Sequence, residues 1–178
     1  VRIALAAIAV GSGTGLTAGA LAAGLRRFRC GKRGLETVGI RRDVTVLDDF
    51  AHHPTAVQET LAALRTGYPS RRIWAVFEPR SASSCRRVFQ DDFARAFEGA
   101  DEVVIAAVFR SSLPEAERLS PERLVADLQT RGRRARYIPE VDAIVGTIAA
   151  EHASGDVVVL MSNGGFGGIH WKLLAALG

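Results

Sequence analysis

The sequence predicts an α/β protein with a Rossmann-like, mostly parallel sheet and helices on both faces. Short apolar runs such as Ile73–Phe77 and Val157–Met161 show no alternation, which is typical of strands buried on both faces. From Val44 onward, strand and helix signals alternate, and this order predicts strands joined by right-handed crossovers. With 178 residues, 48% hydrophobic and 24% charged, the chain can bury a core of one main domain.

Residues 1–29 are predicted to form two helices ahead of the sheet. Segment 4–10 is apolar on all sides, so we expect a buried helix. The glycine-rich stretch 11–15 is not followed by Gly-Lys-Ser/Thr, so we expect an interhelical turn and not a phosphate loop, with Thr17 as the next N-cap. Two short helices cannot form a core alone, so we expect the chain to be a fragment of a longer protein.

The charged, glycine-containing stretch 30–43 is expected to be a linker or hinge, followed by the main domain at residues 44–178. Within that domain, strands are expected at residues 44–47, 73–77, 102–106, 136–138 and 157–161. Helices are expected at residues 54–65, 91–97, 121–131, 141–151 and 168–177. Polar residues that follow parallel strands gather at the carboxyl edge of the sheet, where ligands bind in such folds.

The first polar cluster runs from Asp48 to Pro54, where a strand ends and a helix begins. Alternation places Asp48 and Asp49 on opposite faces. A carboxylate here can accept ribose hydroxyls or cap the helix that starts at Pro54, and we expect one role for each acid. His52 and His53 can position substrate or nucleotide, or stabilise the turn; no further ligands at metal-site spacing accompany them.

A second cluster, residues 78–81, ends the next strand. The Arg80 guanidinium beside a proline is suited to bidentate capture of a carboxylate, and an ion pair with Glu78 is the alternative. Ser81 is a candidate beside it. Further on, the polar segment 109–120 is long enough for a substrate-facing lid, and an ordinary surface loop is the other interpretation.

The third cluster, residues 162–168, contains four glycines between the last strand and a helix. Glycine lets backbone N–H groups approach an anion at a helix N-terminus, although tight turns also collect glycine. We expect Phe166 to be exposed in this loop, which favours binding, and His170 to contact substrate or cap the helix. The candidate residues from this region are Asn163, Gly164, Gly165, Phe166 and His170.

The string from Asp48 to Thr55 (DDFAHHPT) resembles the signature that opens the C-terminal domain of the Mur ligases, the ATP-dependent enzymes that build the murein peptide. Residues 78–81 (EPRS) and 162–170 (SNGGFGGIH) resemble the murein peptide ligase branch of that family. That branch joins UDP-N-acetylmuramate to the tripeptide L-alanyl-γ-D-glutamyl-meso-diaminopimelate during peptidoglycan recycling. The resemblance extends over nearly the whole chain.

The resemblance implies that residues 1–29 are the end of a central domain that binds ATP and Mg²⁺, with its P-loop upstream. It implies a cytoplasmic enzyme in which ATP phosphorylates the muramoyl carboxylate and the peptide amine attacks the acyl phosphate. We expect no catalytic residue in this chain and no ligase activity from it alone. Its partners would be both substrates and the N-terminal and central domains of the same polypeptide.

The resemblance also assigns residues to ligands. Asp49 would bind the ribose, with Arg33 and His52 also on the nucleotide; Gly34 stands where the family usually has arginine. The peptide side would be formed by His53, Arg80, Ser81, Asn163, Gly164, Gly165, Phe166 and His170. The alternatives are the sister ligase that adds L-alanine to the same UDP-sugar and a non-catalytic nucleotide- or peptide-binding module.

Composition argues against other classes. The pI is about 9.7, yet acids are interleaved with the arginines, the net charge is +4, and no basic stripe with exposed aromatics predicts a nucleic-acid partner. A mildly positive net charge is compatible with an anionic small molecule as the ligand. Residues 1–10 are too short to cross a membrane and lack the basic start of a signal peptide. Cys30 and Cys85 show no CxxC spacing, so neither a disulfide framework nor a zinc site is predicted.

Overall fold

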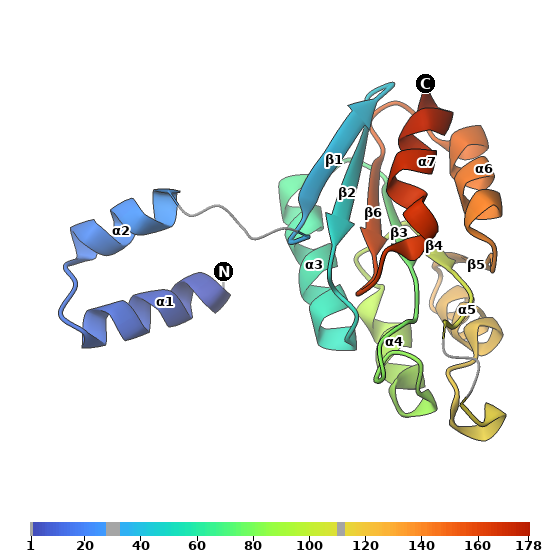
Figure 1. Ribbon diagram of the computed structural model, residues 1–178, viewed down its shortest axis with the longest axis horizontal. Coiled ribbons are helices and arrows are strands. Elements are labelled where there is room, and N and C mark those ends of the chain that lie inside the picture. Colours follow the sequence, from blue (N-terminus) through green and yellow to red (C-terminus); the bar gives the residue numbers. More distant parts are fainter. Residues whose placement is uncertain (1, 28–32, 110–112) are drawn as a thin grey trace. The chain divides into compact units, whose positions relative to one another are not determined.

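The computed structural model describes residues 2–27, 33–109 and 113–178, in two compact units, Val1–Lys32 and Arg33–Gly178. The first unit is a helical hairpin of α1 (Arg2–Gly13) and α2 (Ala18–Arg27) (Figure 1). As predicted, Thr17 caps α2, because its hydroxyl accepts from the Ala20 amide at 3.2 Å. The turn comes later than expected, since α1 continues through Gly13.

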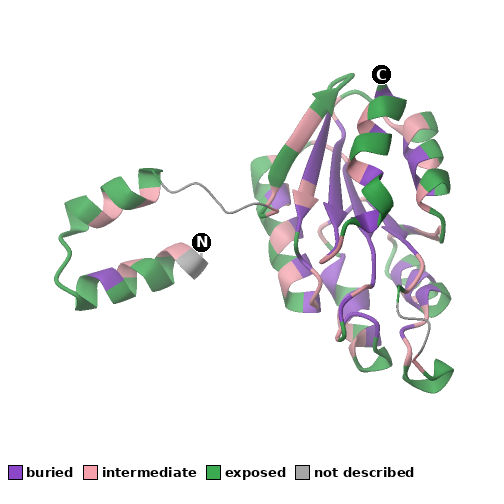
Figure 2. Ribbon diagram, viewed as in Figure 1, coloured by how far each residue is buried: buried purple, intermediate pink, exposed green. Residues whose placement is uncertain are grey.

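The apolar residues of this hairpin are largely exposed (Figure 2). Leu5, Val10 and Leu16 are 58%, 69% and 53% exposed. The prediction that segment 4–10 forms a buried helix is therefore wrong within this unit. A helix with a single helical neighbour can cover only one stripe of its surface.

The second unit is built on a six-stranded sheet in the order β1-β2-β6-β3-β4-β5 (Figure 1). Five strands are parallel and correspond to the predicted ones, while β1 pairs antiparallel with β2. The strands are β1 (Glu36–Arg41), β2 (Val44–Asp49), β3 (Ile73–Phe77), β4 (Glu102–Ile105), β5 (Arg134–Tyr137) and β6 (Val157–Met161).

Strand β1 corrects the expectation that residues 30–43 form a linker. It is an edge strand with four exposed residues and a register shift between Thr37 and Gly39, so it lacks the apolar run of the inner strands. The remaining part of the expected linker, residues 30–32 with Cys30, lies outside the described residues.

Helices cover both faces of the sheet, as predicted. Apolar residues of α3 (Pro54–Gly67), α4 (Gln90–Ala96) and α5 (Pro121–Thr130) form one core cluster with the strands. Those of α6 (Val141–Glu151) and α7 (Ile169–Leu177) form a second cluster on the opposite face. The inner strands β2, β3, β4 and β6 are almost entirely buried, whereas the edge strands β1 and β5 are partly exposed (Figure 2).

The strand order determines which loops meet. Strand β6 lies between β2 and β3, with Met161 in register with both Asp49 and Phe77. The residues that follow these three strands therefore lie side by side at the carboxyl edge. Across the described ranges, no helix is long and apolar enough to cross a bilayer.

Candidate functional site

Backbone hydrogen bonds join the loops that follow β2, β6 and β3. The Glu78 amide donates to the Met161 carbonyl at 3.0 Å, and the Ser162 amide donates to the Asp49 carbonyl at 3.2 Å. The next loop is attached in the same way, because the Phe109 amide donates to the Pro79 carbonyl at 2.9 Å. All three clusters identified in the sequence thus share one continuous edge.

Ser162 lies at the centre of this edge. Its buried hydroxyl donates to the Glu78 carboxylate at 2.5 Å and accepts from the Gly164 amide at 2.9 Å. Its carbonyl accepts from the Arg33 guanidinium at 2.6 Å. A short bond to a buried carboxylate is among the stronger protein hydrogen bonds, so Ser162 holds the last loop against both neighbours.

Arg80 is fixed by its surroundings while its donors remain available. Its guanidinium carbon lies 3.6 Å from the centroid of the Phe109 ring. The side chain also crosses Gly164 so closely that a methyl group there would overlap it. Glu78 is 3.7 Å away, too far for a hydrogen bond. Among the described residues no hydrogen bond uses the guanidinium of Arg80, so a bound carboxylate can be met by both of its terminal nitrogens.

On the other side of Ser162, Asp48 organises Arg33 and His170. The Arg33 Nε donates to Asp48 at 3.0 Å. The His170 Nε2 lies 3.0 Å from the second carboxylate oxygen of Asp48, but the two are not aligned as a hydrogen bond. Asp48 is therefore the acid that takes part in this site.

The Asp49 carboxylate is used for hydrogen bonds within the fold. Its carboxylate accepts from the amides of Leu35 (2.8 Å) and Ala51 (2.9 Å) and from the Thr60 hydroxyl (3.0 Å). The residue is only 6% exposed, so its oxygens face the protein. This geometry does not support the ribose-binding role that the resemblance assigns to Asp49.

The expectation that one of the two acids caps the helix at Pro54 is wrong. His53 is the N-cap of α3, and its Nδ1 accepts from the Thr55 amide at 3.4 Å. Its ring packs edge-on against Phe89, with centroids 4.9 Å apart. The acids are already engaged elsewhere, which leaves the cap to the residue adjoining the proline.

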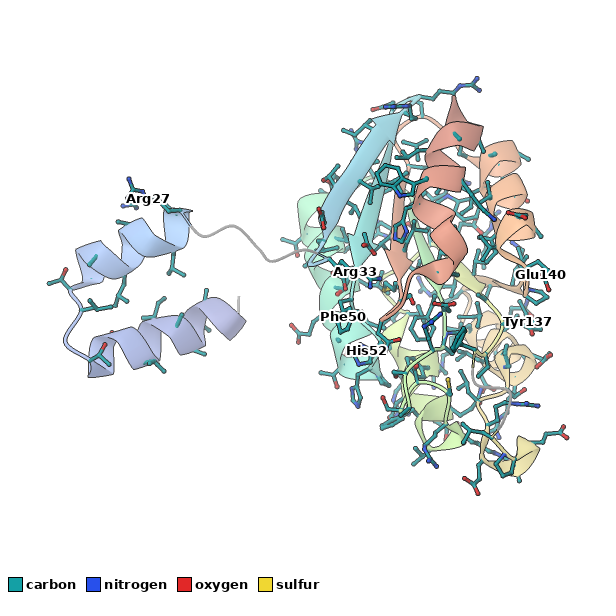
Figure 3. The ribbon with its side chains drawn as sticks, viewed as in Figure 1. Arg27, Arg33, Phe50, His52, Tyr137 and Glu140 are labelled. Carbon is teal, nitrogen blue, oxygen red and sulfur yellow. The ribbon has the colours of Figure 1, made fainter. Side chains whose placement is uncertain are left out.

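Arg33, Phe50 and His52 follow one another at the carboxyl end of β2 (Figure 3). The Arg33 guanidinium carbon is 5.4 Å from the Phe50 centroid, and the His52 ring stands edge-on to Phe50 at 5.1 Å. The His52 Nδ1 lies 2.8 Å from the Phe50 carbonyl, so the histidine is fixed locally. Phe50 is 48% exposed, and an exposed ring beside a guanidinium can stack against a nucleotide base.

Two predicted peptide contacts are buried. Ser81 is 7% exposed, and its hydroxyl bonds to those of Ser83 (3.1 Å) and Ser84 (2.8 Å), which stiffens the turn behind Arg80. The prediction that Phe166 is exposed is wrong, because it is 1% exposed and belongs to the core under α6 and α7. Phe166 anchors the glycine loop from below.

The backbone explains how the loop buries that ring. Phe166, Gly167 and Gly168 all have left-handed φ angles, of 44°, 57° and 72°. Such a run turns the chain sharply and is tolerated mainly by glycine. Two amides expected to cradle an anion are used internally: the Gly164 amide by Ser162, and the Gly168 amide by the Gly165 carbonyl at 2.9 Å.

Two features of the loop have no partner among the described residues. The Asn163 Oδ1 is buried without a hydrogen-bond partner in the structure, and nothing lies within 4 Å of the space above Gly165. Within the described ranges, no three His, Cys, Asp or Glu side chains come together as a metal site. The guanidinium groups of Arg33 and Arg80 can meet anionic groups, and the Phe50 ring can meet aromatic ones.

The match to known proteins covers the same part of the chain. Residues 33–164 match the family model described as Mur ligase, glutamate ligase domain. The chain belongs to the Mur ligase family. The edge that bears Arg80 therefore belongs to a Mur ligase C-terminal domain, and β1, which the sequence analysis missed, lies inside the matched region.

Two curated relatives represent two branches of the family. One is the UDP-N-acetylmuramate–L-alanyl-γ-D-glutamyl-meso-2,6-diaminoheptandioate ligase of Escherichia coli, 39% identical over 174 residues, or 97% of this chain and 36% of that protein. The other is the UDP-N-acetylmuramate–L-alanine ligase of Salinibacter ruber, 37% identical over 165 residues, or 92% of this chain and 34% of that protein. The chain spans about a third of the length of these relatives.

A solved structure agrees with the fold. The murein peptide ligase of Psychrobacter arcticus superimposes with a TM-score of 0.75 at 35% identity, covering 98% of this chain and 36% of that one. The Mur ligase domain described above therefore has the family's mostly parallel sheet.

Sequence reasoning missed two contributors to the site, Ser162 as a connecting residue and Phe109, and it did not predict that Asp48 would orient Arg33. A weak signal existed for Phe109, since it is the aromatic residue in the otherwise polar segment 109–120. Its ring covers Arg80, so the start of this segment faces the site. Residues 110–112 of the segment lie outside the described residues.

Proposed function

We propose that this chain is the substrate-positioning C-terminal domain of an ATP-dependent ligase that joins L-alanyl-γ-D-glutamyl-meso-diaminopimelate to UDP-N-acetylmuramate. The observation that carries the proposal is Arg80, which is held by Phe109 and Gly164 with its guanidinium nitrogens unused by the described residues. A peptide with several carboxylates is the substrate class that such a group recognises best.

In the proposed reaction, ATP phosphorylates the muramoyl carboxylate, and the peptide amine attacks the acyl phosphate and releases phosphate. The sequence contains no Gly-Lys-Ser/Thr phosphate loop, so we assign positioning and not phosphoryl transfer to these residues. Arg80 holds a peptide carboxylate. Phe50 and Arg33 form the nucleotide side, with Arg33 oriented by Asp48.

Glu78 and Ser162 connect these two sides. Their hydrogen bond fixes the start of the glycine loop, while the Ser162 carbonyl holds Arg33. Glu78 also lies near enough to Arg80 to attract its charge without taking up its donors. This arrangement supports simultaneous binding of nucleotide and peptide along one sheet edge.

The second candidate is an L-alanine ligase, favoured by the 37% identity to the Salinibacter ruber enzyme. Free L-alanine is small and carries one carboxylate, whereas the tripeptide carries several. Against this alternative stands the string from Ser162 to His170, which resembles the peptide ligases and which the sister enzymes lack.

Isothermal titration calorimetry with the tripeptide and with L-alanine, each with and without Mg-ATP, tests the proposal. We expect the tripeptide to bind and L-alanine to bind far more weakly. Arg80→Ala should weaken tripeptide binding by about 10- to 100-fold, because it removes charge-assisted hydrogen bonds that contribute about 1.5–3 kcal/mol. Arg95→Ala is the matched control, since this exposed arginine of α4 pairs with nearby Asp92 on the surface.

Preferential binding of L-alanine would favour the second candidate. Tripeptide binding that survives Arg80→Ala unchanged would contradict the role of Arg80. Binding of Mg-ATP alone would reduce the domain to a nucleotide lid.

A further inference from the structure

A hollow of 350 Å³ lies at the carboxyl ends of β4 and β5, beyond the residues considered so far. Residues 107–108, 115 and 118–122, together with Tyr137, line it. Its volume is within the range of small-molecule sites, roughly 300–1,000 Å³. Part of its lining lies in the polar segment 109–120, which the sequence analysis gave as either a substrate-facing lid or a surface loop, and the rest comes from neighbouring residues and the last residue of β5.

The hollow shares a wall with the Arg80 site. Val108 lines the hollow, and the next residue, Phe109, covers Arg80. The Leu119 amide donates to the Cys85 carbonyl at 2.9 Å, which attaches the hollow to the loop that carries Arg80. A ligand held by Arg80 can therefore continue into the hollow along the same edge.

The lining carries both signs of charge. Arg118 supplies a guanidinium, while Glu115 and Glu122 supply carboxylates, and apolar side chains complete the wall. An anion alone would be repelled by the glutamates, and a cation alone by the arginine. A group with an ammonium and a carboxylate on one carbon satisfies both.

Tyr137 adds a neutral hydrogen-bonding group. Burial raises the pKa of its phenol, and Glu122 and Glu140 raise it further against the opposing effect of Arg118. The hydroxyl therefore keeps its proton at neutral pH and can donate to a carboxylate. Tyr137 lies at the end of the sheet away from Arg33 (Figure 3).

We propose that this hollow binds the distal amino-acid group of meso-diaminopimelate, the third residue of the peptide; this inference depends on the proposed function. Arg118 and Tyr137 would meet its carboxylate, and Glu115 or Glu122 its ammonium. The distance between the Arg80 site and the hollow agrees with this assignment. Arg80 follows β3 and the hollow lies at β5, two strand positions away, which is about 10 Å at roughly 4.8 Å per strand. Three extended residues also span about 10 Å.

Calorimetric titration of this chain with three peptides tests the assignment: the diaminopimelate tripeptide, its L-lysine analogue, which lacks the distal carboxylate, and the dipeptide L-alanyl-γ-D-glutamate. We expect the diaminopimelate peptide to bind about tenfold more tightly than the lysine peptide. Arg118→Gln should abolish that difference in affinity. The variant should bind the lysine peptide with an affinity within about twofold of that of the unmodified chain. Tyr137→Phe should reduce the difference in affinity between the two tripeptides without altering the fold.

Two further variants separate the charges. Glu122→Gln should weaken both tripeptides relative to the dipeptide, because both carry the distal ammonium. Glu98→Gln is the matched control, since Glu98 is exposed and does not line the hollow.

Equal affinity for the two tripeptides, or a difference that survives both Arg118→Gln and Tyr137→Phe, would overturn the inference. The proposed function would still stand if Arg80→Ala weakened all three peptides. Failure of every peptide to bind to the folded chain would reject the proposed function, and this inference with it.

Discussion

The two edges of the sheet use arginine in opposite ways. At the amino edge, Arg72 donates to the Asp156 carboxylate through two nitrogens, at 3.0 and 2.6 Å. At the carboxyl edge, the Arg80 guanidinium donates to no group among the described residues and lies against the Phe109 ring and Gly164. The guanidinium donors of Arg72 are used within the fold, whereas those of Arg80 remain available to a ligand.

The amino edge is a closed network of ion pairs. Glu102, at 3% exposure, lies within 3.0 to 3.9 Å of Arg134, Arg136 and Arg72. The Trp74 ring nitrogen donates to Asp156 at 2.9 Å. Buried carboxylates here have hydrogen-bonding partners, which is the condition under which buried charge is tolerated.

The comparison shows that the number of arginines on a surface says little about binding. What matters is whether carboxylates of the same chain already occupy their donors. For this reason a pI of about 9.7 does not predict a polyanion partner here. Among the described residues, no hydrogen bond occupies the Arg80 guanidinium, and that of Arg33 is occupied only in part, because Asp48 and the Ser162 carbonyl take its Nε and one terminal nitrogen.

The largest expected effect is at the amino edge. Asp156→Ala should lower the free energy of unfolding by about 3–5 kcal/mol, because it leaves Arg72 and the Trp74 N–H without their buried partner. Urea denaturation measures this. A loss below about 1 kcal/mol would mean that the network is not structural.

At the carboxyl edge, Gly164→Ala should act on binding and not on the fold. Its methyl group would displace the Arg80 side chain, so we expect about tenfold weaker tripeptide binding, or about 1.4 kcal/mol. Gly146→Ala on the exposed side of α6 is the control, since nothing lies within 4 Å of the new methyl group. Equal effects of the two substitutions would show that the position of Arg80 does not control binding.

The smallest expected effect is a change in acid stability. Burial raises the pKa of Asp156, but hydrogen bonds from Arg72, the Ala153 amide and Trp74 outweigh it and hold the pKa below the ordinary value of 3.8. The folded protein thus binds this proton less tightly than the unfolded chain does. The contribution of Asp156 is complete above the unfolded pKa and is lost as the pH falls through the folded one.

Asp156→Asn should therefore flatten the decrease in unfolding free energy below about pH 5. The control is Asp142→Asn, an 82% exposed aspartate paired with Lys172 on the surface. An unchanged acid slope in Asp156→Asn would contradict the assignment.

The sequence predicted the parallel part of the sheet because buried strands such as Val157–Met161 are continuous apolar runs. It did not predict β1, whose pairing depends on the turn at Arg42 and Asp43. Both residues have left-handed φ angles, 46° and 62°, which hairpin turns usually obtain from Asn-Gly. Because the Arg42-Asp43 turn lacks an Asn-Gly sequence, the sequence pattern does not predict this hairpin.

The site shows the same limit. Arg80 and Asn163 could be placed at the carboxyl edge because each follows a strand. The burial of Phe166 could not, because it results from three successive left-handed residues. Nor could the role of Asp49, whose donors come from Leu35 and Thr60, distant in sequence.

The most direct test pairs Arg72→Ala with Arg80→Ala and measures both urea stability and tripeptide affinity for each. We expect Arg72→Ala to lose about 3 kcal/mol of stability, because it leaves Asp156 as an unpaired buried charge, and to bind the tripeptide as the unmodified chain does. Arg80→Ala should keep its stability within about 1 kcal/mol and lose affinity at least about tenfold. If Arg80→Ala instead unfolds the domain, or Arg72→Ala abolishes binding while folded, the division between a structural edge and a binding edge is incorrect.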